Sequence, residues 1–286
     1  MTPEELDALT AHDDLEELFV SPRHLAGSRA DGDGAIRPLL NAGWSHRYDE
    51  LGNVYVDSPC MRVRVAFTPE GDDIGLWHVT AATLPMHLPK WKMVADAQVP
   101  IEAVAGFTTA LAASVTAEGD EFLVAPLGAT PGWYPLSEAG WRERFIGTRA
   151  TFVSPEGAAQ LICNRSPSSY AGEMSSGPHA WDLVIGDGRY RDHATFTSDT
   201  PAHLIAAFST ALADPAPVPR TRRELPKEHL RYLTAALAIT ADAGPESACA
   251  TAAASRSTTG AKATPTVPTL PTGAIVAAPP RSTAKR

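Results

Sequence analysis

The stretch PLLNAGW at residues 38–44 recurs as PLSEAGW at residues 135–141, a shift of 97 residues (135 minus 38). Two further landmarks repeat in the same order: LWHV at 76–79 with AWDL at 180–183, and PIEAVAGFTTAL at 100–111 with PAHLIAAFSTAL at 201–212. Paired landmarks in one order, with small changes of offset, indicate that one unit of about a hundred residues is written twice. We therefore predict two tandem modules with the same fold.

Each unit reads as a set of strands followed by a helix. In the first copy, Val63, Val65 and Phe67 alternate with other residues, which is the period of a half-buried strand. Val104, Phe107 and Leu111 then fall on one face of a helix, as do their counterparts in the second copy. The sequence predicts the α+β class: two tandem modules, each an antiparallel sheet of four or five strands followed by one packed helix, forming a pseudo-two-fold pair.

The flanks of the repeat differ from the modules in composition. The boundaries predicted from the sequence are an acidic N-terminal helix at 1–18, module 1 at 19–117, module 2 at 118–220, a C-terminal helix at 221–240, and a disordered tail rich in Ala, Thr and Pro at 241–286.

The net charge of −9 is unevenly distributed along the 286 residues. Residues 1–120 carry 8 basic and 19 acidic side chains, residues 121–220 carry 7 and 10, and residues 221–286 carry 9 and 4. An acidic first half argues against a broad phosphate-binding surface there, because such a surface needs an excess of Lys and Arg.

Neither disulfides nor membrane insertion is indicated. The three cysteines Cys60, Cys163 and Cys249 are widely spaced and form no CxxC pattern. The acidic N-terminus does not resemble a signal peptide, and no apolar run is long enough for a membrane span. We expect a cytoplasmic protein that does not contact a membrane.

The residues that carry enzyme chemistry are scattered. Histidines occur throughout the chain without a GxSxG elbow, an HExxH pair or a phosphate-binding loop. His78 and Asp182 are the one near-match between the copies, each following a repeated tryptophan. We predict no catalytic residues, no metal and no cofactor.

Basic residues on the outer face of the sheets suggest nucleic-acid binding. Open sheet faces that bind single strands combine positive charge with aromatic side chains. The candidate nucleic-acid-binding residues are Arg47, Arg62, Arg64, Arg142 and Arg144. The alternative interpretation is that these arginines are ordinary solvated side chains.

Aromatic residues that recur in both copies fit a core better than a stacking platform. The predicted core anchors are Trp44, Trp77, Phe107, Trp141, Trp181 and Phe208.

Several motifs together are similar to a known family. They are FVSPRHLAG at 19–27, the repeated Ala-Gly-Trp, DELGNVYV at 49–56 and TPAHLIAAF at 200–208. On these motifs the chain resembles the actinobacterial SPDY-motif domain family of unknown function, over roughly residues 19–220. The family tetrapeptide stands as SPCM at 58–61 and SPEG at 154–157, and both depart from the family at the third residue. The resemblance implies two tandem domains and no assigned activity, and a turn role for the tetrapeptide tolerates the departures better than a chemical role.

These observations predict a non-enzymatic binding or regulatory protein that associates with nucleic acid through its sheet faces, with DNA as a possible ligand. The alternative is a protein–protein adaptor, since two similar sheets also offer edges and helices to a protein partner.

Overall fold

The computed structural model describes residues 17–28, 32–69, 75–116, 119–166, 169–175, 177–187, 190–225, 229 and 232. The predicted tail at 241–286 and most of the predicted terminal helices lie outside these residues. No helix of the described residues is long and apolar enough to cross a membrane.

Each module contributes five antiparallel strands, as the alternating sequence predicted. In module 1 they are β2 (Ser45–Tyr48), β3 (Val54–Asp57), β4 (Val63–Phe67), β5 (Trp77–Ala82) and β6 (Pro89–Ala95). In module 2 they are β7 (Arg142–Ile146), β8 (Arg149–Val153), β9 (Ala159–Asn164), β10 (Trp181–Asp187) and β11 (Tyr190–Phe196). Neighbouring strands are sequential in each module, so short turns suffice to connect most of them.

The two modules share one sheet of ten strands, in the order β2-β3-β4-β5-β6-β11-β10-β9-β8-β7. The seam is an antiparallel pairing of β6 with β11, with Val94 opposite Thr195 at its centre. Ala95 of β6 pairs with Trp77 at the start of β5, and Phe196 of β11 pairs with Trp181 at the start of β10, so β6 and β11 are equivalent strands. The pair Val94 and Thr195 therefore lies on a local two-fold axis that relates the two modules. The predicted pseudo-two-fold pair is therefore a continuous sheet.

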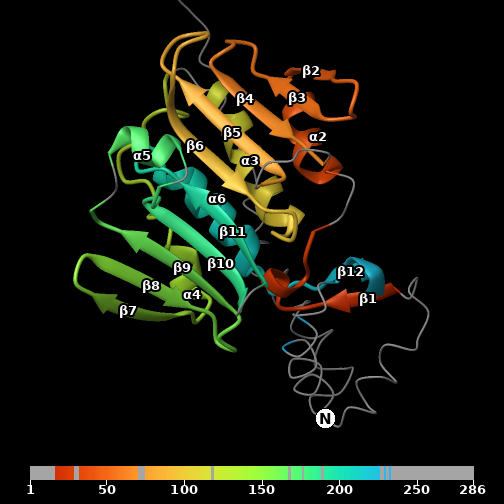
Figure 1. The fold of residues 1–286 in the computed structure, drawn as a ribbon, viewed down its shortest axis with the longest axis vertical. Helices are drawn as coiled ribbons and strands as arrows, with labels where there is room; N and C mark the ends of the chain where they lie inside the picture. Colours follow the sequence, from red (N-terminus) through yellow and green to blue (C-terminus); the bar gives the residue numbers. More distant parts are fainter. Residues whose placement is uncertain are drawn as a thin grey trace, which may run out of the picture. The chain divides into compact units, whose positions relative to one another are not determined.

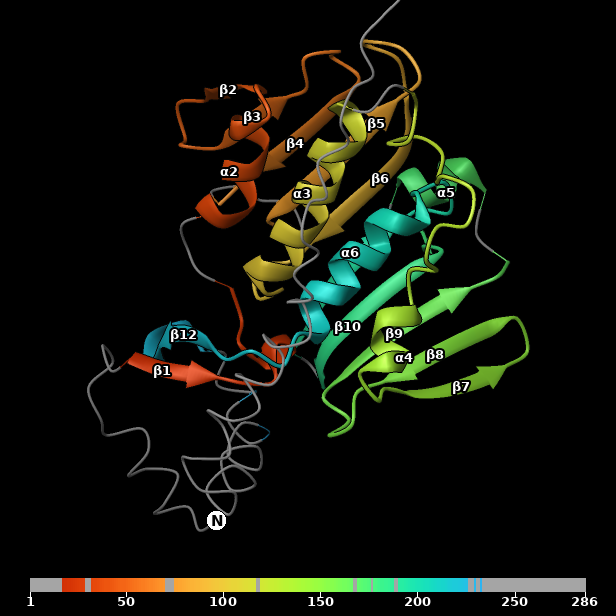
Figure 2. The ribbon, with the colours of Figure 1, turned by 180° about the vertical axis from the view of Figure 1, so that it is seen from behind.

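The helices cover one face of this sheet. They are α2 (Asp33–Asn41) and α3 (Ile101–Thr116) from module 1, and α4 (Tyr134–Glu138) and α6 (Ala202–Ala213) from module 2. Figures 1 and 2 show α3 and α6 side by side across the seam, behind the sheet in the first view and in front of it in the second. The opposite face is called the open face below. A short helix, α5 (Tyr170–Met174), lies at one end of the strands.

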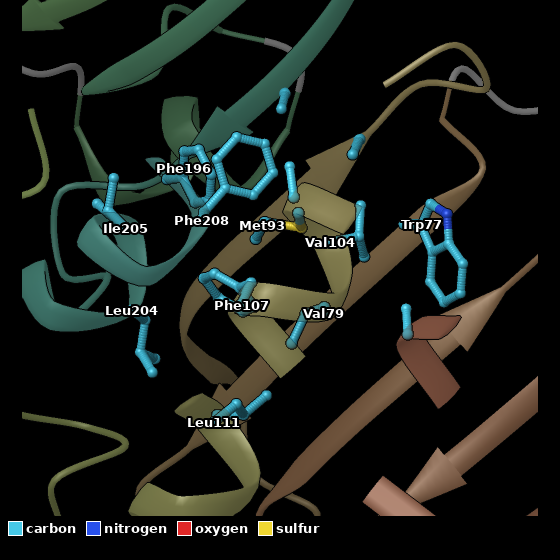
Figure 3. Close-up of a cluster of buried hydrophobic side chains, with 14 of the residues drawn as sticks. Trp77, Val79, Met93, Val104, Phe107, Leu111, Phe196, Leu204, Ile205 and Phe208 are labelled. Atoms are coloured by element: carbon cyan, nitrogen blue, oxygen red, sulfur yellow. The ribbon is translucent and has the colours of Figure 1, made fainter. Parts of the chain in front are cut away.

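A single hydrophobic core lies between the sheet and the helices. Phe107 of α3 and Phe208 of α6 both contact Phe196 of β11, with ring centroids 5.8 and 5.2 Å apart (Figure 3). Gly106 lets the helices approach closely, because a Cβ atom there would lie 2.8 Å from the Ala207 carbonyl oxygen. The packing of small residues thus joins both modules into one folded unit.

A separate two-stranded ribbon joins the ends of the repeat. It pairs β1 (Glu17–Val20) with β12 (Val218–Thr221), and each strand leads into a 3₁₀ turn, Arg23–Leu25 or Arg222–Glu224. Arg220 fastens the ribbon to α3, because its buried guanidinium pairs with Glu102 at 2.6 Å. The predicted helices at 1–18 and 221–240 are therefore wrong at residues 17–18 and 221, where pairing between distant segments overrides the local helical signal, and residues 222–224 form a 3₁₀ turn.

Candidate nucleic-acid interface

Three arginines of module 2 point to the open face of the sheet. On β8, Ala150 and Phe152 are buried beneath the helices, so the alternation of a strand directs Arg149 to the opposite face. Antiparallel partners share a face, and Arg142 and Arg144 stand opposite Val153 and Thr151, which alternate with the buried pair. Arg142, Arg144 and Arg149 form what is called the arginine face below.

The arginine face has no internal neutralisation. All three side chains are exposed. In the described parts of the chain, no ion pair or side-chain hydrogen bond involves any of them. A hollow of about 500 Å³ is lined by Arg142, Glu143, Arg144 and Val153. The three guanidinium groups are thus available to an anionic ligand.

The arginines on the open face of module 1 are engaged by a carboxylate. Arg64 Nε donates to Asp57 at 2.6 Å, and Arg47 Nε lies 4.0 Å from the same carboxylate. The Arg47 guanidinium also lies over the Tyr55 ring, 4.5 Å from its centroid. Asp57, which is largely buried, therefore reduces the positive charge that this face presents to solvent.

The two modules differ at the last residue of β3 and of β8, the strands next to the two edge strands. Asp57 stands opposite Ser45, and its counterpart Val153 stands opposite Arg142. Where module 1 has a carboxylate facing a serine, module 2 has a valine facing an arginine. The same fold therefore presents a neutralised face in one copy and a positive face in the other.

Arg62 does not join either group. Its guanidinium donates to Asp120 at 2.7 Å and lies over the Phe122 ring, 4.7 Å from its centroid. The hydrogen bond from Arg62 lowers the pKa of Asp120, which is consistent with a well-formed pair. This arginine fastens the segment between the modules to the start of β4.

The structure does not bring the five predicted arginines together. Arg47 and Arg144 occupy equivalent positions on β2 and β7, the two edge strands of the sheet. Nine intervals between ten strands, at about 4.8 Å each, separate them by about 43 Å. One short ligand cannot contact both.

The centre of the open face carries acidic and imidazole groups. His193 Nδ1 and Asp182 Oδ1 are 2.8 Å apart, and this hydrogen bond raises the pKa of His193. The backbone N–H of His193 donates to Asp96, whose pKa is raised by burial. His78 lies on the same cross-strand row as Asp182, on the far side of the seam. The described residues contain no cluster of three or more His, Cys, Asp or Glu side chains arranged to hold a metal ion.

The predicted core anchors lie on the helix side. Trp44, Trp77, Phe107, Trp141 and Phe208 are buried, and Trp181 is partly buried against the same core. The open face of β7, β8 and β9 carries Thr151, Gln160 and Ile162 beside the arginines. In the described part of these three strands, this face therefore offers charged, polar and aliphatic groups, with no aromatic ring on which a base would stack.

Arg149 is a site residue that the sequence-based prediction missed. A signal for it was present in the alternation of Arg149, Thr151 and Val153 with Ala150 and Phe152. The repeat landmarks point to the arginines that follow Trp141, and they do not mark the next strand.

The fold defines an α+β protein built from two equivalent modules that share one antiparallel sheet. The family model of SPDY, a domain of unknown function (DUF317), matches residues 57–116 and 153–218. One matched region falls in each module, which is consistent with two tandem copies of this domain. No curated protein and no solved structure matches the chain.

The family tetrapeptides occupy the same turn in both domains. The side-chain oxygen of Ser58 accepts the backbone N–H of Val63, and that of Ser154 accepts the backbone N–H of Ala159. The third residue differs in its contacts: Cys60 lies beside Ser58, whereas Glu156 binds His24 at 2.6 Å. The serine thus shapes the turn in both copies, and the third position fastens the N-terminal segment in one of them.

Proposed function

We propose that the protein, taken to be cytoplasmic, is a non-enzymatic nucleic-acid-binding protein that contacts phosphates through the arginine face. The observation that carries the proposal is that Arg142, Arg144 and Arg149 are exposed on one face with no ion pair among the described residues. Arginine binds phosphate well because its planar guanidinium donates two parallel hydrogen bonds.

The spacing of the three arginines suits an extended anionic chain. Arg142 and Arg144 are two residues apart on β7, and Arg149 stands opposite Ile146 on the neighbouring strand. Steps of two residues at about 3.4 Å each distribute the charges over about 14 Å along the strand direction. That length corresponds to about four phosphates of one strand at about 3.4 Å per nucleotide.

The surroundings limit what this site recognises. Without aromatic rings beside the arginines, bases gain no stacking, so we expect binding that depends on phosphates and little on sequence. The carboxylates of Asp96 and Asp182 at the centre of the sheet disfavour a path across the seam. The proposal therefore confines nucleic acid to β7, β8 and β9.

The test is fluorescence anisotropy with labelled single-stranded and double-stranded DNA of about 30 nucleotides, starting at about 10 mM salt. With three phosphate contacts to a single strand, the affinity is expected to fall about 100-fold between about 10 and 100 mM salt. Replacing Arg142, Arg144 and Arg149 with Gln should abolish binding, and so should the double charge reversal Arg142→Glu with Arg144→Glu.

The matched control removes basic residues from module 1. Arg47→Gln with Arg64→Gln makes the net charge of the chain more negative but leaves the arginine face intact, so we expect the affinity to stay within about twofold. Equal losses of affinity from both modules would point to unspecific attraction by net charge. A probe that does not bind near about 10 mM salt contradicts the proposal and favours the protein–protein adaptor.

A further inference from the structure

Two methionines of module 1 are held in a backbone conformation that side chains seldom adopt. Met61 has φ of 57° and Met86 has φ of 62°. Among the described residues, these are the only two besides glycine with a positive φ. Left-handed backbone at residues with a Cβ costs stability, and such residues gather at functional sites.

The equivalent turn of module 2 has a glycine at the position of Met61, and glycine adopts a positive φ without strain. Met61 N donates to the Ser58 carbonyl oxygen, and Gly157 N donates to the Ser154 carbonyl oxygen in the equivalent turn. Gly157 has φ of 83° and therefore adopts the turn without strain. Module 1 places a methionine where glycine is the favourable residue.

Both methionines belong to an exposed apolar patch. The exposed fractions of its members are 49% for Met61, 53% for Leu84, 86% for Met86 and 80% for Leu88. All but Met61 lie in the turn at 83–88 between β5 and β6. In module 2, β10 ends at Asp187 and β11 begins at Tyr190, so the corresponding connection is shorter. The patch is thus specific to module 1.

A hollow between the two methionines gives the patch a shape. Its volume is about 240 Å³, and Ala81, Ala82 and Pro89 contribute apolar lining beside Met61 and Met86. A cavity of about 150 Å³ holds a benzene molecule, so this hollow accommodates one bulky apolar side chain. Methionine suits such a site because its flexible thioether adapts to different shapes.

One side of the rim carries charged and polar side chains, among them Arg64, His87 and Asp57. Arg64 lines it with 44% of its side chain exposed, while its Nε binds Asp57. His87 also lines the hollow, from the turn at 83–88, and is exposed. Asp57 binds Arg64 through Nε, so a carboxylate next to the apolar anchor of a ligand would meet the terminal nitrogens of Arg64 at this rim.

We propose that the hollow between Met61 and Met86 binds a protein segment that presents one bulky apolar side chain next to a carboxylate. A concave pocket that fits a single anchor favours a peptide over a flat lipid surface. This site lies on module 1 and uses none of the arginine face, so its test is independent of the test of nucleic-acid binding.

The test is NMR of the full chain with ¹³C-labelled methionine methyl groups, which gives one signal for each of the 5 methionines. The probe is the peptide acetyl-Asp-Leu-Asp-amide, titrated to about 10 mM. We expect the Met61 and Met86 signals to move together and to saturate. Met93 is buried in the core and Met174 lies on α5, so their signals should stay in place.

Two matched peptides separate the two parts of the proposal. Acetyl-Asp-Ser-Asp-amide lacks the apolar anchor and should leave both signals unmoved. Acetyl-Lys-Leu-Lys-amide keeps the anchor and reverses the charge, so it should bind about two- to fivefold more weakly. Equal shifts with the serine peptide, or no shift with any of the three, would overturn the proposal.

Two variants at one position keep the test independent of folding. Met61→Gly adopts the turn as Gly157 does, so it should fold at least as stably as the parent chain and lose the Met86 shift. Met61→Leu retains an apolar side chain and should preserve that shift. Binding by Met61→Gly with unchanged affinity contradicts the pocket. Vesicles of phosphatidylcholine and phosphatidylglycerol serve as a further probe. If they broaden the Met61 and Met86 signals while the peptide has no effect, the proposal is overturned and the ligand is a lipid surface.

Discussion

Substituting Val153 with Asp should give module 2 a carboxylate that pairs with an arginine, as Asp57 does in module 1. Asp57 engages Arg64 and approaches Arg47, whereas Val153 at the equivalent position leaves its neighbours free. A carboxylate at 153 would stand opposite Arg142 on the edge strand. Because Val153 is only partly buried and Asp is already present at the matching position, we expect the variant to fold.

The size of the effect follows from how many arginines remain free to bind phosphate. For a single strand, the logarithm of the affinity falls with the logarithm of the salt concentration, with a slope of about 0.7 per bound phosphate. Lowering the salt concentration from about 1 M to about 10 mM therefore raises the affinity about 25-fold for each bound phosphate. Engaging one arginine should weaken binding about 25-fold and lower the slope from about 2.1 to about 1.4.

The assay is anisotropy over a salt series with three matched variants. Val153→Asp is the main substitution, and Val153→Asn, which has nearly the shape of the aspartate without its charge, should bind within about twofold of the parent chain. Asp57→Val releases Arg64 and Arg47 on module 1, outside the strands proposed to bind, so we expect its affinity and slope to stay close to those of the parent chain. Circular dichroism melts would show that each protein is folded.

A Val153→Asp protein that melts normally and binds with unchanged affinity and slope would refute this reasoning. It would show that Arg142 and Arg144 only protect an edge strand from pairing with other chains, which is a common role of charge on such strands. Equal losses of affinity in the aspartate and asparagine variants would instead indicate that the shape of the strand is what matters.

Three further predictions concern stability. Gly106→Ala should lower the free energy of unfolding by about 1 to 3 kcal/mol in urea, despite alanine's higher helix propensity, because its methyl group would meet the backbone of α6. Gly157→Met should lower it by about 1 kcal/mol and Met61→Gly should raise it by up to about 1 kcal/mol; changes of the opposite sign would contradict the strain assigned to this turn. Although burial opposes ionisation of Glu156, the hydrogen bond and charge of His24 lower its pKa to about 2. The ionised Glu156 therefore contributes at most about 3 kcal/mol to the free energy of unfolding, fully above pH 4.5, and this contribution is lost as the pH falls toward about 2. Glu156→Gln should remove this pH dependence of the unfolding free energy measured in urea. An unchanged pH dependence would assign it to other groups.

The parts of the fold that depend on local pattern were predictable. Strands with alternating apolar residues and the helices around Phe107 and Phe208 follow from periodicity, and the repeat made each prediction twice. The single ten-stranded sheet was not predictable, because the pairing of β6 with β11 involves no periodicity that differs from the other strands. The ribbon of β1 and β12 joins segments about two hundred residues apart, so local propensity carries no trace of it.

The candidate site was predictable only in part, for a related reason. Sequence shows that an arginine lies on the outer face of a strand, but it does not show which carboxylate lies across from it. Arg64 and Arg144 look alike in the sequence, and only the register reveals that Asp57 engages the first.

The differences between the two domains fall at positions where the fold tolerates either residue. Val153 and Asp57 end equivalent strands on the open face, so exchanging them alters surface charge without disturbing the core under the helices. Met61 and Gly157 occupy one turn with the same backbone hydrogen bond, so exchanging them alters the exposed patch at a small cost in backbone strain. Duplication supplies a second copy of the same fold, and substitutions at such positions then give each copy its own surface. The positive face of module 2 and the apolar hollow of module 1 would then serve different ligands, and a chain in which Val153→Asp and Met61→Gly are combined should bind both ligands more weakly while the sheet and its core stay folded.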